Sequence, residues 1–192
     1  MGTHQAATGT DTMINGVNVD RLLSTIDAIK AVPGLAKFTF RASNRWMGGG
    51  LNRTTIGGFR GAGAENDREF FVIDNAEPML MLGGDETPNP LEYVLHALVG
   101  CLTTTFVYHA SLIGVRIQEI ESRVEGNLDL QGFLGLREDV HNGFEDVRAT
   151  FRVRADCSAE TLDELMLVAR RRSPVLEILA GQVPMAVNCE PM

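Results

Sequence analysis

Cys101 is the residue of this sequence best placed to do covalent chemistry. It lies in the middle of one long apolar stretch, residues 91–113, which the pattern predicts to be a helix. Gly100 precedes it and threonines 103–105 follow. Glycine costs about 1 kcal/mol of helix propensity relative to alanine, and β-branched side chains also disfavour helix. A locally weak helix around a thiol favours a functional role, although a free cysteine is more often a small core residue.

Nucleophilic chemistry at Cys101 requires help from a positive charge. The thiolate is the reacting species, and a free thiol titrates near ~8.5, so a cation or a helix N-terminus must favour ionisation. Cys101 lies about three turns inside its predicted helix, beyond the reach of the helix dipole. We therefore expect a cation from another part of the fold.

Several short motifs appear in a fixed order around this helix. The helix is entered through Gly83-Gly84-Asp85-Glu86-Thr87-Pro88-Asn89-Pro90. Further motifs follow at residues 124–130, 144–151, 173–175 and 183–185. In this order, and over most of the chain from about Phe38, they resemble the osmotically inducible protein C and organic hydroperoxide resistance (OsmC/Ohr) superfamily.

The resemblance implies an activity and its residues. In the superfamily the cysteine that Cys101 matches attacks organic hydroperoxides, and an arginine from the first hairpin holds its thiolate. Here the candidates flank the Gly48-Gly49-Gly50 turn: Arg53, which we favour, and Arg45. The alternative for each is an exposed arginine at a strand end. Apolar neighbours such as Leu98 would favour alkyl peroxides over hydrogen peroxide.

Glu92 marks a first departure from the superfamily pattern. The typical hydroperoxide-resistance branch has a carboxylate directly after the Asn-Pro pair, where this chain has Leu91. Some OsmC-like branches instead have glutamate one residue later, so the resemblance implies a different branch of the same superfamily. Glu92 follows one residue later and, at ~100° per residue, points to the opposite side of the helix from Cys101. We expect Glu92 to close a capping box with Asn89 instead.

Ser173 marks a second departure. In the superfamily a second cysteine at this position condenses with the sulfenic acid, and a hydroxyl cannot do so. Ser173 is predicted to be the N-cap of a late helix. An external thiol reductant would then complete the cycle. Cys157 and Cys189 are alternative resolving thiols, though each is more often an inert residue.

The hydrophobic periodicity, together with the resemblance, indicates an α+β fold with antiparallel sheets around long central helices. Residues 1–35 are expected to form a polar tail and an appended helix, and residues 36–192 an OsmC-like domain. Period-two and helical patterns predict the remaining elements. These are strands within 38–73, 120–130 and 147–153, helices over 158–169 and 174–179, and a final strand over 183–187.

The helix over 91–113 also predicts a partner subunit. It is apolar on almost every face, and at ~1.5 Å per residue it spans ~35 Å, more than a small single-chain sheet covers. The resemblance implies an intertwined homodimer. Polar residues within the helix, among them Glu92 and His96, argue against a membrane span.

Composition excludes some partners. The formal charge of −8 disfavours nucleic acids and anionic membranes. No group of Cys, His, Asp and Glu has metal-site spacing, so we expect neither metal nor cofactor. Residues 1–18 lack the pattern of a secretory signal, and we expect a cytoplasmic protein. The alternative function is a non-enzymatic dimeric module that binds a small apolar or thiol-reactive ligand.

Overall fold

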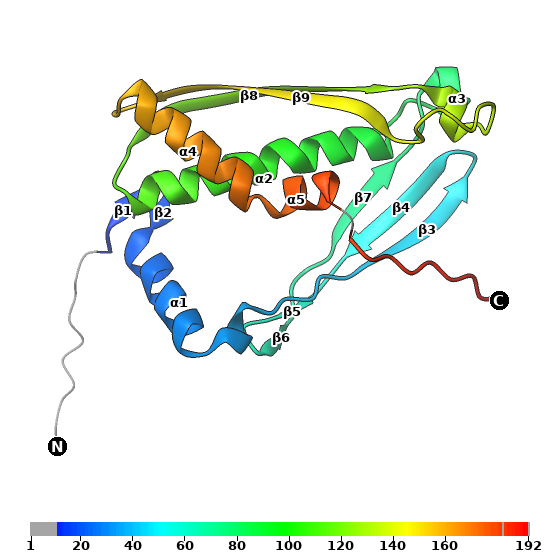
Figure 1. Ribbon diagram of the computed structural model, residues 1–192. Coiled ribbons are helices and arrows are strands. Elements are labelled where there is room, and N and C mark those ends of the chain that lie inside the picture. Colours follow the sequence, from blue (N-terminus) through cyan, green and yellow to red (C-terminus); the bar gives the residue numbers. More distant parts are fainter. Residues whose placement is uncertain (1–10, 182, 192) are drawn as a thin grey trace. The chain divides into compact units, whose positions relative to one another are not determined.

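The computed structural model describes residues 11–181 and 183–191 and shows an α+β protein of helices and antiparallel sheets (Figure 1). By internal contacts the chain forms two compact units, one up to Tyr93 and one from Val94 onward. The division falls inside the long helix α2 (Pro90–Leu112). The predicted boundary between residues 35 and 36 stays a prediction, and the two units are described in turn.

The first unit begins with a small hairpin and a helix. Strands β1 (Met13–Ile14) and β2 (Val17–Asn18) pair antiparallel and lead into α1 (Val19–Ala31). Asn18 caps α1, because its side-chain oxygen accepts a hydrogen bond from the Arg21 amide at 2.9 Å. A 3-10 turn, η1 (Pro33–Ala36), follows where Pro33 ends the helical pattern. A helix is thus present where the sequence predicts one, and residues 1–10 of the expected polar tail lie outside the described residues.

An antiparallel sheet follows, as predicted. Its strand order is β3-β4-β7, formed by β3 (Ala42–Gly48), β4 (Leu51–Ile56) and β7 (Phe71–Asn75). Gly48 and Gly49 turn the chain between β3 and β4 with φ of 121° and 55°, values that favour glycine. A second hairpin of β5 (Phe59–Gly61) and β6 (Ala64–Asn66) lies between β4 and β7 in sequence.

The start of α2 is fixed by side chains. It follows a 3-10 turn, η2 (Met79–Met81). The Asn89 amide donates to Glu92 Oε2 and the Glu92 amide donates to Asn89 Oδ1, each at 2.8 Å. This is the predicted capping box, with Pro90 as the first helical residue. The Tyr93 hydroxyl donates to the Asp74 carbonyl at 2.8 Å, so it ties this first turn to β7.

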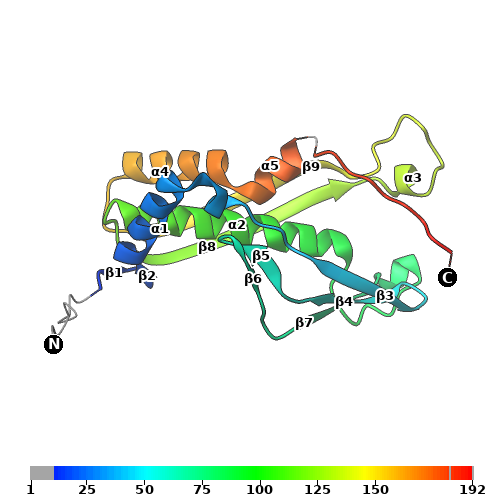
Figure 2. The same ribbon diagram turned by 90° about the horizontal axis from the view of Figure 1, so that it is seen from below.

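The second unit packs α2 and two later helices against a long hairpin. Strands β8 (Ile117–Leu128) and β9 (Phe144–Ala155) pair antiparallel, and the short helix α3 (Leu130–Phe133) lies in the loop between them. Helices α4 (Ala159–Arg172) and α5 (Pro174–Ala180) follow. Figures 1 and 2 show α2 and α4 on one face of this hairpin. The core between them is formed by Phe106, Ala110, Val115, Leu165 and Ala169.

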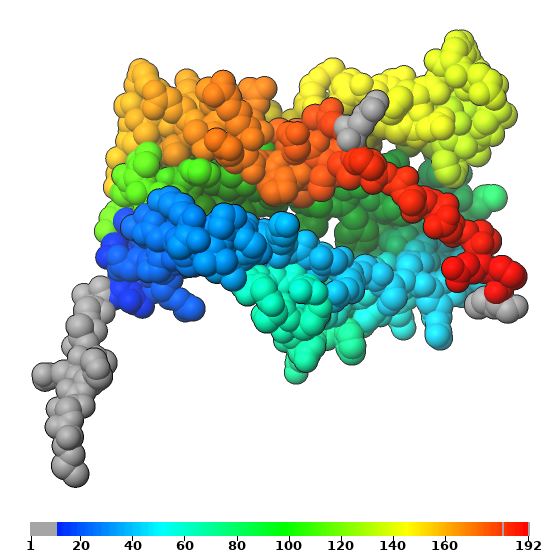
Figure 3. All heavy atoms as spheres, turned by 60° about the horizontal axis from the view of Figure 1, so that its bottom comes forward, coloured from blue at the N-terminus to red at the C-terminus, as the bar shows by residue number. Residues whose placement is uncertain are grey.

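Among the described residues, the buried side chains of α2 lie mainly along one stripe, with Ser111 beside its end. Leu98, Leu102, Phe106 and Ala110 recur every four residues and are each at most 5% exposed. In the space-filling view α4 and α5 lie against α2 (Figure 3). Elsewhere on the helix Tyr108 is 47% exposed. The length and composition of α2 also suit a membrane span, but the core helix of a soluble protein has the same properties.

The predicted final strand is wrong for this chain by itself. Residues 183–191 have no strand structure, and Val187 is 93% exposed. A strand requires a neighbouring strand to satisfy its backbone hydrogen bonds. Among the described residues none pairs with this segment.

Candidate functional site

The Cys101 thiol lies on α2 beside a serine hydroxyl. Its side chain is partly buried, and its Sγ accepts a hydrogen bond from Ser173 Oγ at 3.2 Å. Thr105, one turn further along α2, donates its hydroxyl to the Cys101 carbonyl at 2.8 Å. A threonine hydroxyl within a helix commonly donates in this way to the carbonyl four residues earlier. The sulfur and the backbone of Cys101 therefore have different hydroxyl partners.

Ser173 forms the junction between α4 and α5. Its amide donates to the Ala169 carbonyl at 2.9 Å, at the end of α4, and its Oγ accepts from the Leu176 amide at 3.3 Å, at the start of α5. The predicted N-cap is confirmed. Pro174 then takes the first helical position, where a missing amide hydrogen costs nothing. Because both ends of the junction are hydrogen-bonded, the Ser173 side chain is held in one place at 2% exposure.

Sequence reasoning missed the contact between Ser173 and Cys101. It assigned the serine only a capping role. The available signal was the superfamily pattern, because a second cysteine that condenses with the sulfenic acid must lie beside the first. The structure shows that position 173 meets this condition in the present chain.

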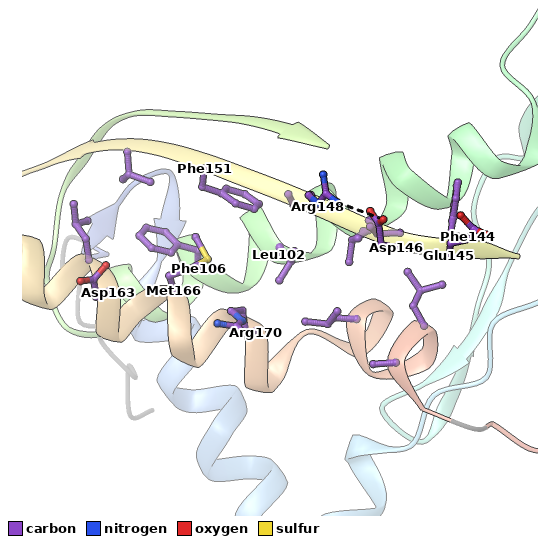
Figure 4. A pocket seen from close by; sticks show the side chains of 18 of the residues that line it. Leu102, Phe106, Phe144, Glu145, Asp146, Arg148, Phe151, Asp163, Met166 and Arg170 are labelled. Atoms are coloured by element: carbon purple, nitrogen blue, oxygen red, sulfur yellow. Dashed lines mark hydrogen bonds and ion pairs between the residues drawn. The ribbon is translucent and has the colours of Figure 1, made fainter. Parts of the chain in front are cut away.

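A large groove opens in the second unit, next to the part of α2 that carries Cys101. Its volume is about 1090 Å³, and Leu98 and Leu102, the neighbours of Cys101 on α2, line it. Figure 4 shows Leu102, Phe106 and Met166 in the space between α2, β9 and α4. A mostly apolar lining with a few polar groups is typical of small-molecule sites.

Charged side chains from two elements line the same groove. Arg148 of β9 is engaged, since it pairs with Asp146 at 3.5 Å and with Glu125 at 3.7 Å. Arg170 of α4 also lines the groove, and in the described part of the chain it forms no ion pair. It lies three residues before Ser173, a spacing that places two residues on one side of a helix. Arg170 is thus a cation that sequence reasoning overlooked.

The two predicted arginines lie in the sheet of the first unit. Arg45 of β3 and Arg53 of β4 are directly opposite each other in the strand pairing. Arg53 donates from Nε and Nη2 to the Asp74 carboxylate at 2.7 and 2.8 Å. Arg45 has no ion pair among the described residues. Since Cys101 belongs to the second unit, its pairing with either arginine stays a prediction.

Asp74 is a second residue that sequence reasoning missed. Asp74 on β7 is directly opposite Arg53 on β4 in the strand pairing. The sequence does not predict which residues of two paired strands lie opposite each other, so this contact could not be found from it. The hydrogen bonds from Arg53 lower the pKa of Asp74 below its usual value, and the carboxylate in turn raises the pKa of Arg53. Only one edge of the guanidinium is used, so its remaining N–H groups can bind another anion.

The other thiols differ from Cys101 in their surroundings. Cys157 packs against the apolar core of the second unit, as expected of a small hydrophobic residue. Cys189 is exposed. Across the described residues no three His, Cys, Asp or Glu side chains are grouped to hold a metal ion.

Comparison with known proteins identifies the family. Residues 83–188, more than half of the chain and including Cys101 and Ser173, match the OsmC-like protein family. No curated protein matches the chain.

Solved structures show the same fold. An OsmC-like protein from Mycoplasma pneumoniae is 16% identical with a TM-score of 0.57, over 74% of this chain and 88% of that one. An OsmC-like protein of unknown function from Vibrio cholerae is 11% identical with a TM-score of 0.54, over 75% and 95%. An organic hydroperoxide resistance protein OsmC from Legionella pneumophila is 14% identical with a TM-score of 0.51, over 74% and 90%. At these identities the likeness establishes the fold.

Proposed function

This chain belongs to the OsmC-like protein family, and on that premise we propose that it is a thiol-dependent peroxidase that reduces organic hydroperoxides through Cys101. The observation that carries the proposal is the hydrogen bond between Ser173 and the Cys101 sulfur. The chain keeps a partly accessible cysteine at the position of the superfamily nucleophile, next to the position of its second cysteine. Family membership, with a neighbour described as a hydroperoxide resistance protein, supports a general role in peroxide stress.

The proposed reaction needs one thiol from the protein and two from outside. The Cys101 thiolate attacks the distal peroxide oxygen, the O–O bond breaks, and the departing alkoxide takes a proton and leaves as an alcohol. Cys101 becomes a sulfenic acid. An external thiol condenses with it, releases water and forms a mixed disulfide. A second external thiol then reduces that disulfide and restores Cys101.

A cation would hold the thiolate and the developing alkoxide. Arg53 is the first candidate, because Asp74 fixes its guanidinium while leaving one edge free. Arg45, its neighbour across the strands, is the second. Preorganised donors of this kind lower the cost of the charge that develops during reaction.

We propose that the working form is a homodimer in the cytoplasm. The exposed apolar side chains of α2 and its end support a dimer, since Tyr108 on α2 and Ile113 directly after it are 47% and 61% exposed. An apolar helix of this length requires cover on the remaining faces. A second copy of the chain would supply it.

The substrate would be an alkyl or aryl hydroperoxide. The groove beside α2 has apolar side chains along its length, from Leu98 to Phe151 and Met166. Burial of an organic group there is favourable by about 25 cal/mol per Å² of apolar surface. Hydrogen peroxide would gain nothing from such a lining.

One alternative function has its own support. Ser173 removes the internal resolving thiol, and the groove volume of about 1090 Å³ is ample for a bound ligand. A non-enzymatic dimeric module that binds a small apolar or thiol-reactive molecule would use the same groove without turnover.

Turnover with a monothiol separates the two functions. The protein is mixed with cumene hydroperoxide and excess 2-mercaptoethanol, and peroxide loss is followed over time. The peroxidase proposal predicts many turnovers for the wild type and for Cys157→Ser and Cys189→Ser, and none for Cys101→Ser. Saturable binding of cumyl alcohol without peroxide loss would support the binding module instead.

A further inference from the structure

The hydroxyl of Ser173 has one proton, and the structure shows which atom receives it. Its Oγ already accepts a hydrogen bond from the Leu176 amide. Its own proton is directed to Cys101 Sγ at 3.2 Å. A hydroxyl buried at 2% exposure needs an acceptor, because leaving its proton unsatisfied costs free energy. The cysteine sulfur provides it.

The strength of this hydrogen bond depends on the charge of the sulfur. A neutral thiol is a weak acceptor, whereas a hydrogen bond to a charged group is shorter and about twice as strong. The Ser173 hydroxyl is therefore best matched to the sulfur when Cys101 is the attacking thiolate.

The capping role of Ser173 makes the donor rigid. The residue is fixed between α4 and α5 by the backbone bonds at its amide and its Oγ. Little conformational entropy is lost when its hydroxyl turns to the sulfur, since the side chain is already ordered. Preorganisation of this kind is what makes a donor effective in a reaction.

We propose that Ser173 is a positioning residue for the Cys101 nucleophile, whose hydroxyl holds the thiolate in place. The inference rests on the proposed peroxidase function for its role in turnover, but the hydrogen bond itself acts on any reaction of the thiolate. The serine that replaces the second cysteine thus has a use of its own beyond capping.

Charged groups near this contact remain unchanged when Ser173 is replaced. Arg170, Arg171 and Arg172 close α4 and Glu177 begins α5. Arg148 and Asp146 of β9 line the groove, and His109 lies two turns beyond Cys101 on α2. A change confined to the Ser173 hydroxyl therefore separates the effect of the hydroxyl on Cys101 from the effects of these charged side chains.

The test uses two variants that lose the hydroxyl and two controls. Ser173→Ala removes both the hydroxyl and the cap, whereas Ser173→Gly removes the hydroxyl but keeps most of the capping preference. Ser173→Thr retains both. Ser158→Ala is the matched control, because Ser158 caps α4 in the same way, accepting from the Thr161 amide at 3.2 Å.

The measurement is the rate of iodoacetamide alkylation of Cys101 at pH 7, with thermal unfolding recorded for each variant. We expect Ser173→Ala and Ser173→Gly to slow this alkylation by about tenfold, because each loses a hydrogen bond to the attacking sulfur. Ser173→Thr and Ser158→Ala should keep the wild-type rate. Sulfenic acid formation with cumene hydroperoxide should slow by a similar factor.

Two results distinguish this inference from the proposed function. An unchanged alkylation rate in both Ser173→Ala and Ser173→Gly would overturn the positioning role, even if the wild type reduces hydroperoxides. Slower alkylation in both variants, together with a wild type that forms no sulfenic acid, would uphold the role of Ser173 and refute the peroxidase proposal.

Discussion

Arg53 holds Asp74 through two parallel hydrogen bonds of 2.7 and 2.8 Å between neighbouring strands. A bidentate pair of this kind fixes the plane of the guanidinium. The superfamily pattern places a carboxylate after the Asn-Pro pair, and this chain has Leu91 there. Asp74 supplies a carboxylate from a different element.

Replacement of Arg53 tests the cation. Arg53→Ala should slow the reaction of Cys101 with cumene hydroperoxide by about 10²-fold, because a positioned electrostatic helper is typically worth that much. Stopped-flow measurement of single-turnover rates gives the answer. Arg45→Ala and Arg170→Ala are the comparisons, and a larger loss in either would move the role to that residue.

Asp74→Asn tests whether the carboxylate orients Arg53. The neutral amide cannot accept both hydrogen bonds, so the guanidinium loses its fixed plane. We expect a rate loss smaller than that of Arg53→Ala, and no further loss when the two changes are combined. Additive losses in the double variant would show that Asp74 acts independently of Arg53.

The Asp74 pair also predicts a pH dependence of stability. Arg53 lowers the pKa of Asp74, so the folded state binds this proton less readily than the unfolded chain. The contribution is present above the unfolded pKa of ~3.9 and is lost as pH falls through the lower, folded value. Thermal unfolding of wild type and Asp74→Asn should differ at pH 6 and converge as the pH falls far enough to protonate Asp74 in the folded state. A constant difference down to pH 2 would contradict the linkage.

The proposed dimer can be tested by placing a charged residue on the exposed part of α2. Leu98 and Leu102 are buried within the chain itself, so charged residues there would disrupt the fold of a single chain. Tyr108→Glu is the better variant, and Leu23→Glu on α1 is the control, because both wild-type side chains are 47% exposed. Sedimentation at micromolar concentration should show a dimer for wild type and control and a monomer for Tyr108→Glu. A stable wild-type monomer would refute the dimer.

Ser173→Cys should restore an internal resolving thiol. The Ser173 oxygen lies 3.2 Å from the Cys101 sulfur, so a cysteine at this position would be close enough to condense with the sulfenic acid and release water. After one equivalent of hydroperoxide, mass spectrometry of the unreduced protein should show a bridge between residues 101 and 173. Persistence of the sulfenic acid in this variant would show that the geometry does not support condensation.

The sequence predicts the local structure well because local chemistry determines it. The capping box of Asn89 and Glu92 and the cap at Ser173 both join residues within four positions. The prediction of a strand over 183–187 is wrong because a strand also needs a neighbouring strand to pair with. The period-two pattern gives no information about such a neighbour.

The candidate site depends on contacts that the sequence does not encode locally. The contact between Ser173 and Cys101 spans 72 positions, and Arg53 and Asp74 are 21 positions apart. Both arise from how α4, α5 and the strands pack, so neither follows from hydrophobic periodicity. The superfamily pattern located Cys101 and position 173, but not their hydrogen bond.

Cys101 should react with organic hydroperoxide and stop at the sulfenic acid. This is measured by treating the reduced protein with one equivalent of cumene hydroperoxide in the presence of dimedone and mapping the product by mass spectrometry. We expect a dimedone adduct on Cys101 as the major species, because Ser173 cannot form a disulfide. An unmodified Cys101, or a major bridge from Cys101 to Cys157 or Cys189, would contradict it.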